Sequence, residues 1–113
     1  MIQRVRAAAP CRVDLSGGTL DIWPLGLLHP GACTVNVAVD LPMEVELRPG
    51  GRSYRVALGD VVVEAESLAE LSRNPATALV AMVAGYYELP PAEISVRSSS
   101  PLGAGLGASS ALA

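Results

Sequence analysis

Three glycines at every second position, Gly103, Gly105 and Gly107, lead directly into Ser109 and Ser110 near the end of this 113-residue sequence. Because glycine adopts a positive φ without strain and has no side chain, such a loop lets a bulky anion approach the backbone N–H groups. The following residues, 109–113, are typical of the first turn of a helix, whose unpaired N–H groups would point back into the loop. The pattern therefore predicts a binding loop for a polyphosphate.

Two familiar phosphate-binding patterns do not fit this spacing. The Walker pattern needs Lys-Ser/Thr after its last glycine, and the dinucleotide fingerprint has two residues between its last glycines. A flexible Gly/Ala tail is the simpler alternative, but residues 93–97 resemble a strand, and Pro101 and Leu106 punctuate the run. A linker requires neither feature.

A second polar group lies between residues 10 and 21, where Arg12, the pair Gly17-Gly18 and Asp21 stand at a strand-to-loop junction. A carboxylate can accept hydrogen bonds from two neighbouring hydroxyls, and a guanidinium can stabilise charge on a transferring phosphoryl group. By itself such a turn is more commonly structural. Phosphorylation of a sugar would use the glycines, the carboxylate and the guanidinium together.

The elements that must position these residues follow from hydrophobic periodicity and turn signals. A strand or two should span residues 2–15, with a bend or a sheet edge at Pro10, because proline cannot donate to a ladder. The expected strands that follow are residues 32–39, 43–47, 54–58 and 60–65, and a turn at residues 49–51 makes a meander of the strands 43–47 and 54–58. A last strand at residues 93–97 delivers the loop. The expected helices are residues 67–71 and 74–89, with an irregular or briefly helical segment at residues 21–30.

Composition limits the function classes. The net charge is −3 and the eight basic residues are scattered, so no nucleic-acid partner is expected. No apolar run has the length of a signal peptide or a membrane span, which favours a cytoplasmic protein without membrane contact. Cys11 and Cys33 lack metal-site spacing, and we expect two small buried thiols.

The glycine loop resembles the second motif of the GHMP kinases, whose usual form is Pro-x-x-x-Gly-Leu-Gly-Ser-Ser-Ala. Here Ala108 replaces the first serine and Ser110 replaces the following alanine, so Ser109 falls on the family's Mg²⁺-associated position. Residues 10–21 resemble the family's first motif, and the two motifs occur in the family's order, about ninety residues apart.

The first motif is similar to Pro-Gly-Arg-Val-Asn-Leu-x-Gly-Glu-His-Thr-Asp of galactokinase, and to Arg-Ile-x-Leu-x-Gly-Gly-x-Thr-Asp of heptose-7-phosphate and fucose kinases. Gly18 stands where galactokinase has an acidic residue, which points to the Gly-Gly subgroup. Leu20 departs from the usual threonine, which leaves the identity of the sugar open.

The resemblance implies an α+β, two-layer fold of the ribosomal protein S5 domain 2-like type, with a mixed, mostly antiparallel sheet and helices on one face. Residues 1–113 would form an incomplete N-terminal domain that stops just after the phosphate loop. ATP and Mg²⁺ would be the cofactors, and a hydroxyl of a sugar or sugar phosphate would accept the γ-phosphoryl group.

The same resemblance assigns roles to residues. Arg12 would be catalytic, offsetting developing charge; Gly17, Gly18 and Asp21 would bind the sugar; and Ser109 would help to hold Mg²⁺. The implied nucleotide-binding residues are Pro101, Gly103, Ala104, Gly105, Leu106, Gly107, Ala108, Ser109 and Ser110.

The family's catalytic aspartate and third glycine-rich motif lie beyond the second motif. We therefore expect this chain to need a missing C-terminal part and to be inactive alone. Three alternatives stay open: a non-catalytic nucleotide-binding fragment or module, a GHMP kinase for a non-sugar substrate of the homoserine or mevalonate type, and a purely structural domain.

Overall fold

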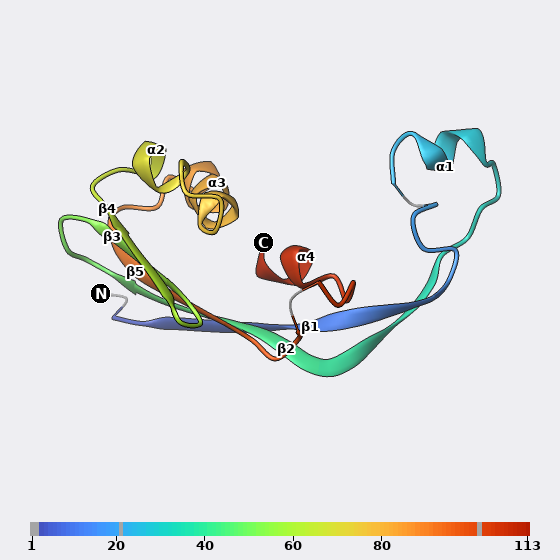
Figure 1. Cartoon of the computed structure of the whole chain (residues 1–113), viewed down its shortest axis with the longest axis horizontal. Helices are drawn as coiled ribbons and strands as arrows, with labels where there is room; N and C mark the ends of the chain where they lie inside the picture. Colours follow the sequence, from blue (N-terminus) through green and yellow to red (C-terminus); the bar gives the residue numbers. More distant parts are fainter. Residues whose placement is uncertain (1–2, 21, 102) are drawn as a thin grey trace.

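A single mixed sheet organises the molecule (Figure 1). The computed structural model describes residues 3–20, 22–101 and 103–113. Its five strands stand in the order β1-β2-β5-β3-β4, and β3 and β5 form the parallel pair while the other neighbours are antiparallel. The strands are β1 (Val5–Ser16), β2 (Val35–Pro49), β3 (Tyr54–Leu58), β4 (Val61–Ala65) and β5 (Ala92–Ser98).

Three of the four described helices cover one face of this sheet (Figure 1). They are α2 (Leu68–Leu71), α3 (Ala78–Tyr86) and α4 (Ala108–Leu112), whereas α1 (Leu25–Leu28) lies at the far end of the β1–β2 ribbon. The predicted α+β class, with a mostly antiparallel sheet and helices on one face, is confirmed. No helix in the described ranges is both long and apolar enough to cross a bilayer.

The core lies between the sheet and the two helices α2 and α3. Ile94 and Val96 of β5 and Val56 of β3 are buried there, together with Leu71 of α2 and Val80 of α3. Because side chains alternate along a strand, the residues between them point to the other face, which carries charged groups. In β2 the alternation of Met43, Val45 and Leu47 with two glutamates follows the same rule, and these three residues face the core.

The expected meander is wrong in one respect. β3 and β4 form a hairpin, but β2 and β3 are not neighbours, because β5 lies between them: Ile94 is paired with both Leu47 and Val56. A strand inserted centrally buries both of its apolar residues against the helices, which an edge position would not do. The turn at residues 49–53 reverses the direction of the chain but does not decide which strand pairs with the edge of β2.

Two expected strands, residues 32–39 and 43–47, are one continuous strand, β2. The bend predicted at Pro10 is present as a register shift between Pro10 and Cys11, and β1 is an edge strand as expected. Pro10 stands opposite Pro42, so neither residue can donate a ladder hydrogen bond at this position.

Helix α3 is shorter than the expected 74–89. The Asn74 side chain accepts a hydrogen bond from the Ala76 N–H group (3.0 Å), which closes a turn before the helix. The buried Thr77 hydroxyl donates to the Leu71 carbonyl (2.7 Å) and fixes the link between α2 and α3. Tyr86 and Tyr87, at the end of α3, are exposed.

The β1–β2 ribbon extends beyond the other strands and carries the loop with α1 (Figure 1). Val35 and Val37 of this ribbon are 49% and 48% exposed, whereas alternation in the expected strand 32–39 predicts them on its buried face. Cys11 is buried as expected, but Cys33 is exposed. Val35, Val37 and Cys33 are exposed because no second layer of structure covers this part of the two-stranded ribbon.

Candidate functional site

The glycine loop has the backbone geometry that the sequence predicts. Gly103, Gly105 and Gly107 have φ angles of 72°, 69° and 69°, a region that side chains rarely tolerate. A Cβ atom on Gly103 or Gly105 would meet nothing within 4 Å, so both glycines border open space. Neither glycine is therefore explained by packing, which leaves conformation and access as the reasons for its presence.

The N–H groups of this loop are available to a ligand. Within the described ranges, Gly103, Gly105 and Gly107 donate no hydrogen bond to another described residue, whereas the Ala104 N–H group donates to the Pro101 carbonyl at 3.3 Å. Successive N–H groups in a strongly curved backbone form concave anion sites. The loop thus has the donors that phosphate oxygens require.

A pocket of about 320 Å³ lies against the loop. Ser109 lines this pocket and Ser110 does not, which agrees with the sequence preference for Ser109. The complete lining is Met43, Ser98, Ser100, Pro101, Gly103, Ala104, Gly105, Leu106, Gly107, Ala108 and Ser109.

Sequence reasoning missed Met43, Ser98 and Ser100. The Ser98 hydroxyl accepts from the Ser100 N–H group (3.2 Å) and donates to the Ser100 carbonyl (3.1 Å), and the Ser99 N–H group donates to the Pro42 carbonyl (3.1 Å). The bond from Ser99 anchors the base of the loop to β2, and the two Ser98 bonds fix the turn at residues 98–100. Three consecutive serines directly before Pro101 were the available signal.

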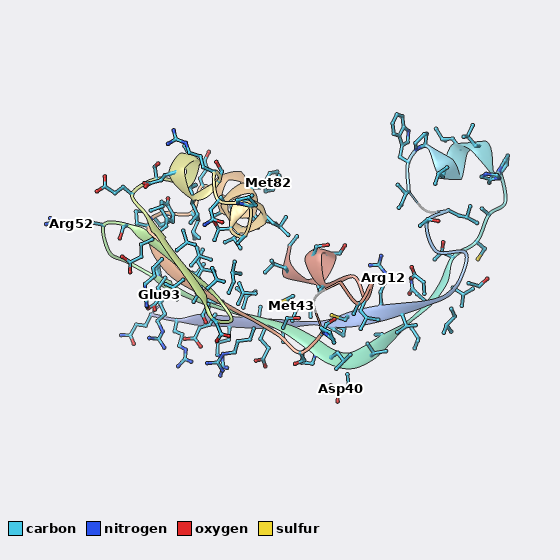
Figure 2. The ribbon with its side chains drawn as sticks, viewed as in Figure 1. Arg12, Asp40, Met43, Arg52, Met82 and Glu93 are labelled. Carbon is cyan, nitrogen blue, oxygen red and sulfur yellow. The ribbon has the colours of Figure 1, made fainter. Side chains whose placement is uncertain are left out.

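Arg12 lies against the glycine loop, although the two are far apart in the sequence. The backbone N–H group of Arg12 donates to the Leu106 carbonyl at 2.9 Å. Its side chain packs on Gly107, where an added Cβ atom would lie 3.5 Å from Cγ and from Nη1 of Arg12. Figure 2 shows this side chain on the side of the sheet that carries α4, with Asp40 on the opposite side. Arg12 therefore lies beside the glycine loop, and its catalytic role stays a prediction.

The Gly17-Gly18 turn reaches Arg12 through Asp14. An added Cβ atom on Gly18 would lie 3.1 Å from Oδ2 of Asp14, and Oδ1 of Asp14 lies 3.7 Å from Nε of Arg12. Gly17 has a φ of 71°, and a side chain there would overlap the Cys33 carbonyl oxygen, so packing already requires glycine. Asp21 lies outside the described residues, and the sugar-binding roles of Asp21, Gly17 and Gly18 stay predictions.

The donor set suits a metal ion that arrives with phosphates rather than one held by the protein alone. Among the described residues, no group of three or more Asp, Glu, His or Cys side chains could hold a metal. Mg²⁺ retains several waters and is usually bound by one or two protein ligands and phosphate oxygens. The Ser109 hydroxyl at the pocket could be one such ligand.

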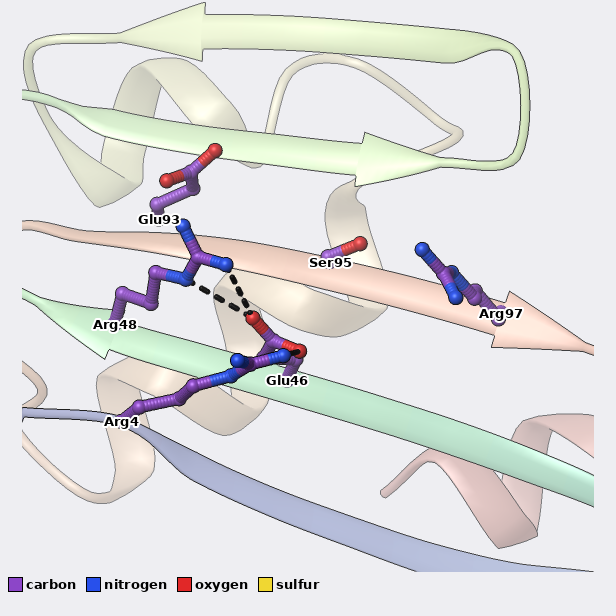
Figure 3. Close-up of a pocket in the computed structure, with 6 residues that line it drawn as sticks. All are labelled: Arg4, Glu46, Arg48, Glu93, Ser95 and Arg97. Carbon is purple, nitrogen blue, oxygen red and sulfur yellow. Dashed lines mark hydrogen bonds and ion pairs between the residues drawn. The ribbon is translucent and has the colours of Figure 1, made fainter.

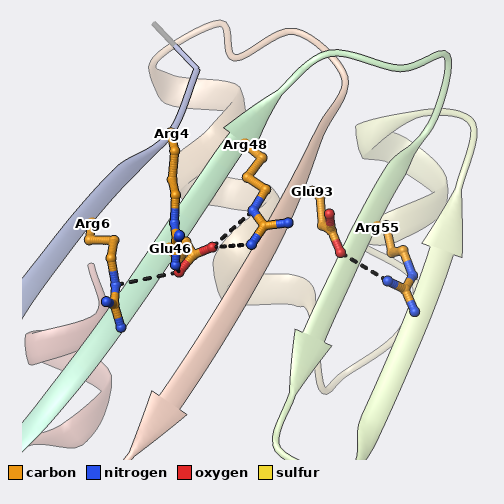
Figure 4. Close-up of polar contacts among 6 residues, drawn as sticks. All are labelled: Arg4, Arg6, Glu46, Arg48, Arg55 and Glu93. Carbon is orange, nitrogen blue, oxygen red and sulfur yellow. Dashed lines mark hydrogen bonds and ion pairs between the residues drawn. The ribbon is translucent and has the colours of Figure 1, made fainter.

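A second pocket, of about 160 Å³, lies on the opposite face of the sheet (Figure 3). Arg4, Arg6 and Arg48 surround Glu46 there (Figure 4). The hydrogen bond from Arg4 is the main cause that lowers the pKa of the Glu46 carboxyl below its ordinary value of 4.5; partial burial opposes it, and Arg48 acts in the same direction as Arg4. Arg55 pairs with Glu93 at 2.9 Å. Ion pairs across strands and along β2 thus account for the charged residues around Glu46 without a ligand.

The fold of this chain, a five-stranded mixed sheet with the glycine loop after β5, is similar to that of solved GHMP-type kinases. A D-glycero-D-manno-heptose 1-phosphate kinase from Bacteroides thetaiotaomicron matches with a TM-score of 0.75 and 21% identity, over 93% of this chain and 37% of that one.

A sugar kinase from Campylobacter jejuni matches with a TM-score of 0.66 and 19% identity, over 97% of this chain and 36% of that one. The Methanococcus jannaschii mevalonate kinase matches at 0.68 and 18%, over 96% and 37%. The present chain thus spans little more than a third of the length of these structures. No family model and no curated protein matches the sequence. At these identities the likeness establishes the fold, and the predicted resemblance is confirmed at that level.

Proposed function

We propose that this chain is the nucleotide-binding part of a GHMP-type small-molecule kinase, which transfers the γ-phosphoryl group of ATP to a hydroxyl of a sugar or sugar phosphate. One observation carries the proposal: three glycines with positive φ border an open pocket, and Arg12 packs against the last of them. The fold of the matching kinases supports it.

Each residue has a limited task in this scheme. The backbone N–H groups of the loop, those of Gly103, Gly105 and Gly107 among them, hold the phosphates, and the Arg12 guanidinium offsets negative charge beside Gly107. The Ser109 hydroxyl supplies one ligand to the Mg²⁺ that accompanies ATP. ATP itself supplies the phosphoryl group; the chain binds and orients it. A single anionic contact at a helix terminus contributes about 0.3 to 2 kcal/mol, so several donors must act together.

A sugar is the preferred acceptor because of the first motif. Arg12, the Gly17-Gly18 turn and Asp21 resemble the corresponding segment of sugar kinases more than that of isoprenoid or homoserine kinases. The fold does not discriminate, since two matching structures are sugar kinases by name and one is a mevalonate kinase. A kinase for a non-sugar alcohol is therefore the nearest alternative.

Nucleotide binding without phosphoryl transfer is the second candidate function. The described residues that line the loop pocket include no carboxylate, histidine or lysine. Such a lining can hold a polyphosphate but contributes no general base. We expect the 113-residue chain to bind ATP without turning it over.

The test is ATP binding by the chain and by its Gly105→Val variant, measured by calorimetry and by amide chemical shifts. A β-branched side chain opposes positive φ and occupies space that the phosphates need, so affinity should fall by about tenfold or more. Gly59→Val is the matched control, because Gly59 also has a positive φ (58°) and open space but lies in the β3–β4 turn. Equal affinities of Gly105→Val and wild type, in folded protein, would remove the loop from the mechanism.

A further inference from the structure

Asp14 is the carboxylate nearest to Arg12 in the described structure, and no role has been assigned to it above. The two residues are separated by one position on β1, so their side chains share a face of the strand. Oδ1 of Asp14 lies 3.7 Å from Nε of Arg12, while Nη1 of Arg12 is directed to Gly107. One edge of the guanidinium thus faces Asp14, and its terminal nitrogen lies against the phosphate loop.

The Asp14 carboxylate is itself confined. It packs beneath Gly18, where an added Cβ atom would lie 3.1 Å from Oδ2 and 3.3 Å from Cβ of Asp14. Asp14 and Arg12 are both partly exposed, at 36% and 42% of their side chains. A partly exposed ion pair adds little to stability. Its effect is therefore expected in the direction of the Arg12 side chain rather than in folding.

Two effects of Asp14 on a bound polyphosphate have opposite signs. Its negative charge repels an anion at the loop, so removal of the charge should strengthen binding if charge alone matters. Its contact with Nε restricts the rotamers of Arg12, so its removal should weaken binding if the position of Arg12 matters. Whether the affinity for polyphosphate rises or falls when Asp14 is replaced therefore distinguishes the charge effect from the positioning effect.

We propose that Asp14 is a positioning residue, which holds the Arg12 guanidinium against Gly107 so that its terminal nitrogens meet the phosphates of the ligand. This inference rests on the proposed function of the loop. It adds a residue of the first motif to the phosphate site and connects the Gly17-Gly18 turn with that site.

Inorganic tripolyphosphate is the probe, because it presents phosphates without a base or a sugar. Its affinity for the full 113-residue chain is measured by calorimetry in low salt. Asp14→Ala should weaken binding by about two- to fivefold, in the range of one exposed charge-assisted contact. Asp14→Asn, which keeps an acceptor oxygen in place, should lose less. The Nε–H resonance of Arg12 should shift in both variants.

The control is Asp40→Ala, which removes the same charge from the opposite side of the sheet (Figure 2) and should not weaken binding. In an Arg12→Ala background, Asp14→Ala should cause no further loss. Unchanged or tighter binding by Asp14→Ala overturns the positioning role, as does a loss that persists without Arg12, and the proposed function survives both results. Failure of the wild-type chain to bind tripolyphosphate overturns the proposed function together with this inference.

Discussion

At the scale of single residues, the positive φ angles of Gly103, Gly105 and Gly107 explain why the loop tolerates no ordinary side chain. The first two glycines border open space, whereas Gly107 lies against Arg12. A glycine needed only for its φ angle could be packed closely against other residues of the protein. The combination of strain-free glycine and empty space is what favours a ligand.

Asp21→Asn tests the substrate class at this scale. Under the proposed function, the amide keeps the size of the side chain but loses the charge that strengthens hydrogen bonds to two hydroxyls, at a cost of about 1.5 to 3 kcal/mol. This cost corresponds to about a ten- to hundredfold fall in kcat/KM for the sugar. The affinity for ATP should stay nearly constant. Unchanged sugar kinetics in a destabilised variant would make Asp21 a structural turn residue and remove the sugar assignment.

At the scale of elements, the helix-free face of the sheet carries two groups of ion pairs, one around Glu46 of β2 and one between Arg55 of β3 and Glu93 of β5 (Figure 4). Glu46 accepts contacts from Arg4, Arg6 and Arg48, and with its carboxylate neutralised the three guanidinium groups would repel one another. The contacts stabilise the ionised carboxyl, which lies near the middle of the network.

Glu46→Gln should therefore destabilise the fold at neutral pH. Because the folded-state pKa of Glu46 is lowered, its stabilisation is fully present above the ordinary value of 4.5 and is lost as the pH falls through the folded-state pKa. Urea denaturation of both proteins should show a difference at about pH 7 that shrinks by about pH 3. Glu64→Gln is the control, since that exposed carboxylate contacts Arg55 alone among the described ion pairs. A difference that does not depend on pH would contradict the ionic explanation.

At the scale of the whole molecule, the chain is elongated, with extents of 50 × 28 × 27 Å and a radius of gyration of 16.3 Å. A compact domain of about 100 residues has a radius of gyration of about 13 Å. The excess comes from the β1–β2 ribbon and the loop with α1, which extend past the other strands (Figure 1). The exposed apolar side chains there are Leu15, Ile22, Trp23, Leu25, Leu27, Leu28, Val35 and Val37.

A ribbon of two strands without a covering layer is marginally stable. The amides of residues 35–39 should therefore exchange with solvent at least about tenfold faster than those of Ile94 and Val96 in the central strand. Amide exchange followed by NMR under native conditions measures this directly. Uniform protection at increasing protein concentration would show instead that another copy of the chain covers the ribbon.

Local features of this protein could be predicted from its sequence because they depend on neighbouring residues. Periodicity predicted the strand that contains Ile94 and Val96, Pro10 marked an irregular edge strand, and the alternate glycines predicted positive φ. The Ser67–Leu71 segment was also predicted correctly as a short helix, with Ser67 capping it.

Tertiary structure decided what depends on residues distant in sequence. It inserted β5 between β2 and β3, buried Thr77 against the Leu71 carbonyl and left Val35 and Val37 exposed. It also placed Asp14 between the Gly17-Gly18 turn and Arg12, and Arg12 against Gly107. Periodicity specifies which face of a strand is apolar, but strand order and the meeting of Arg12 with Gly107 follow from burying those faces together, which is a property of the whole chain.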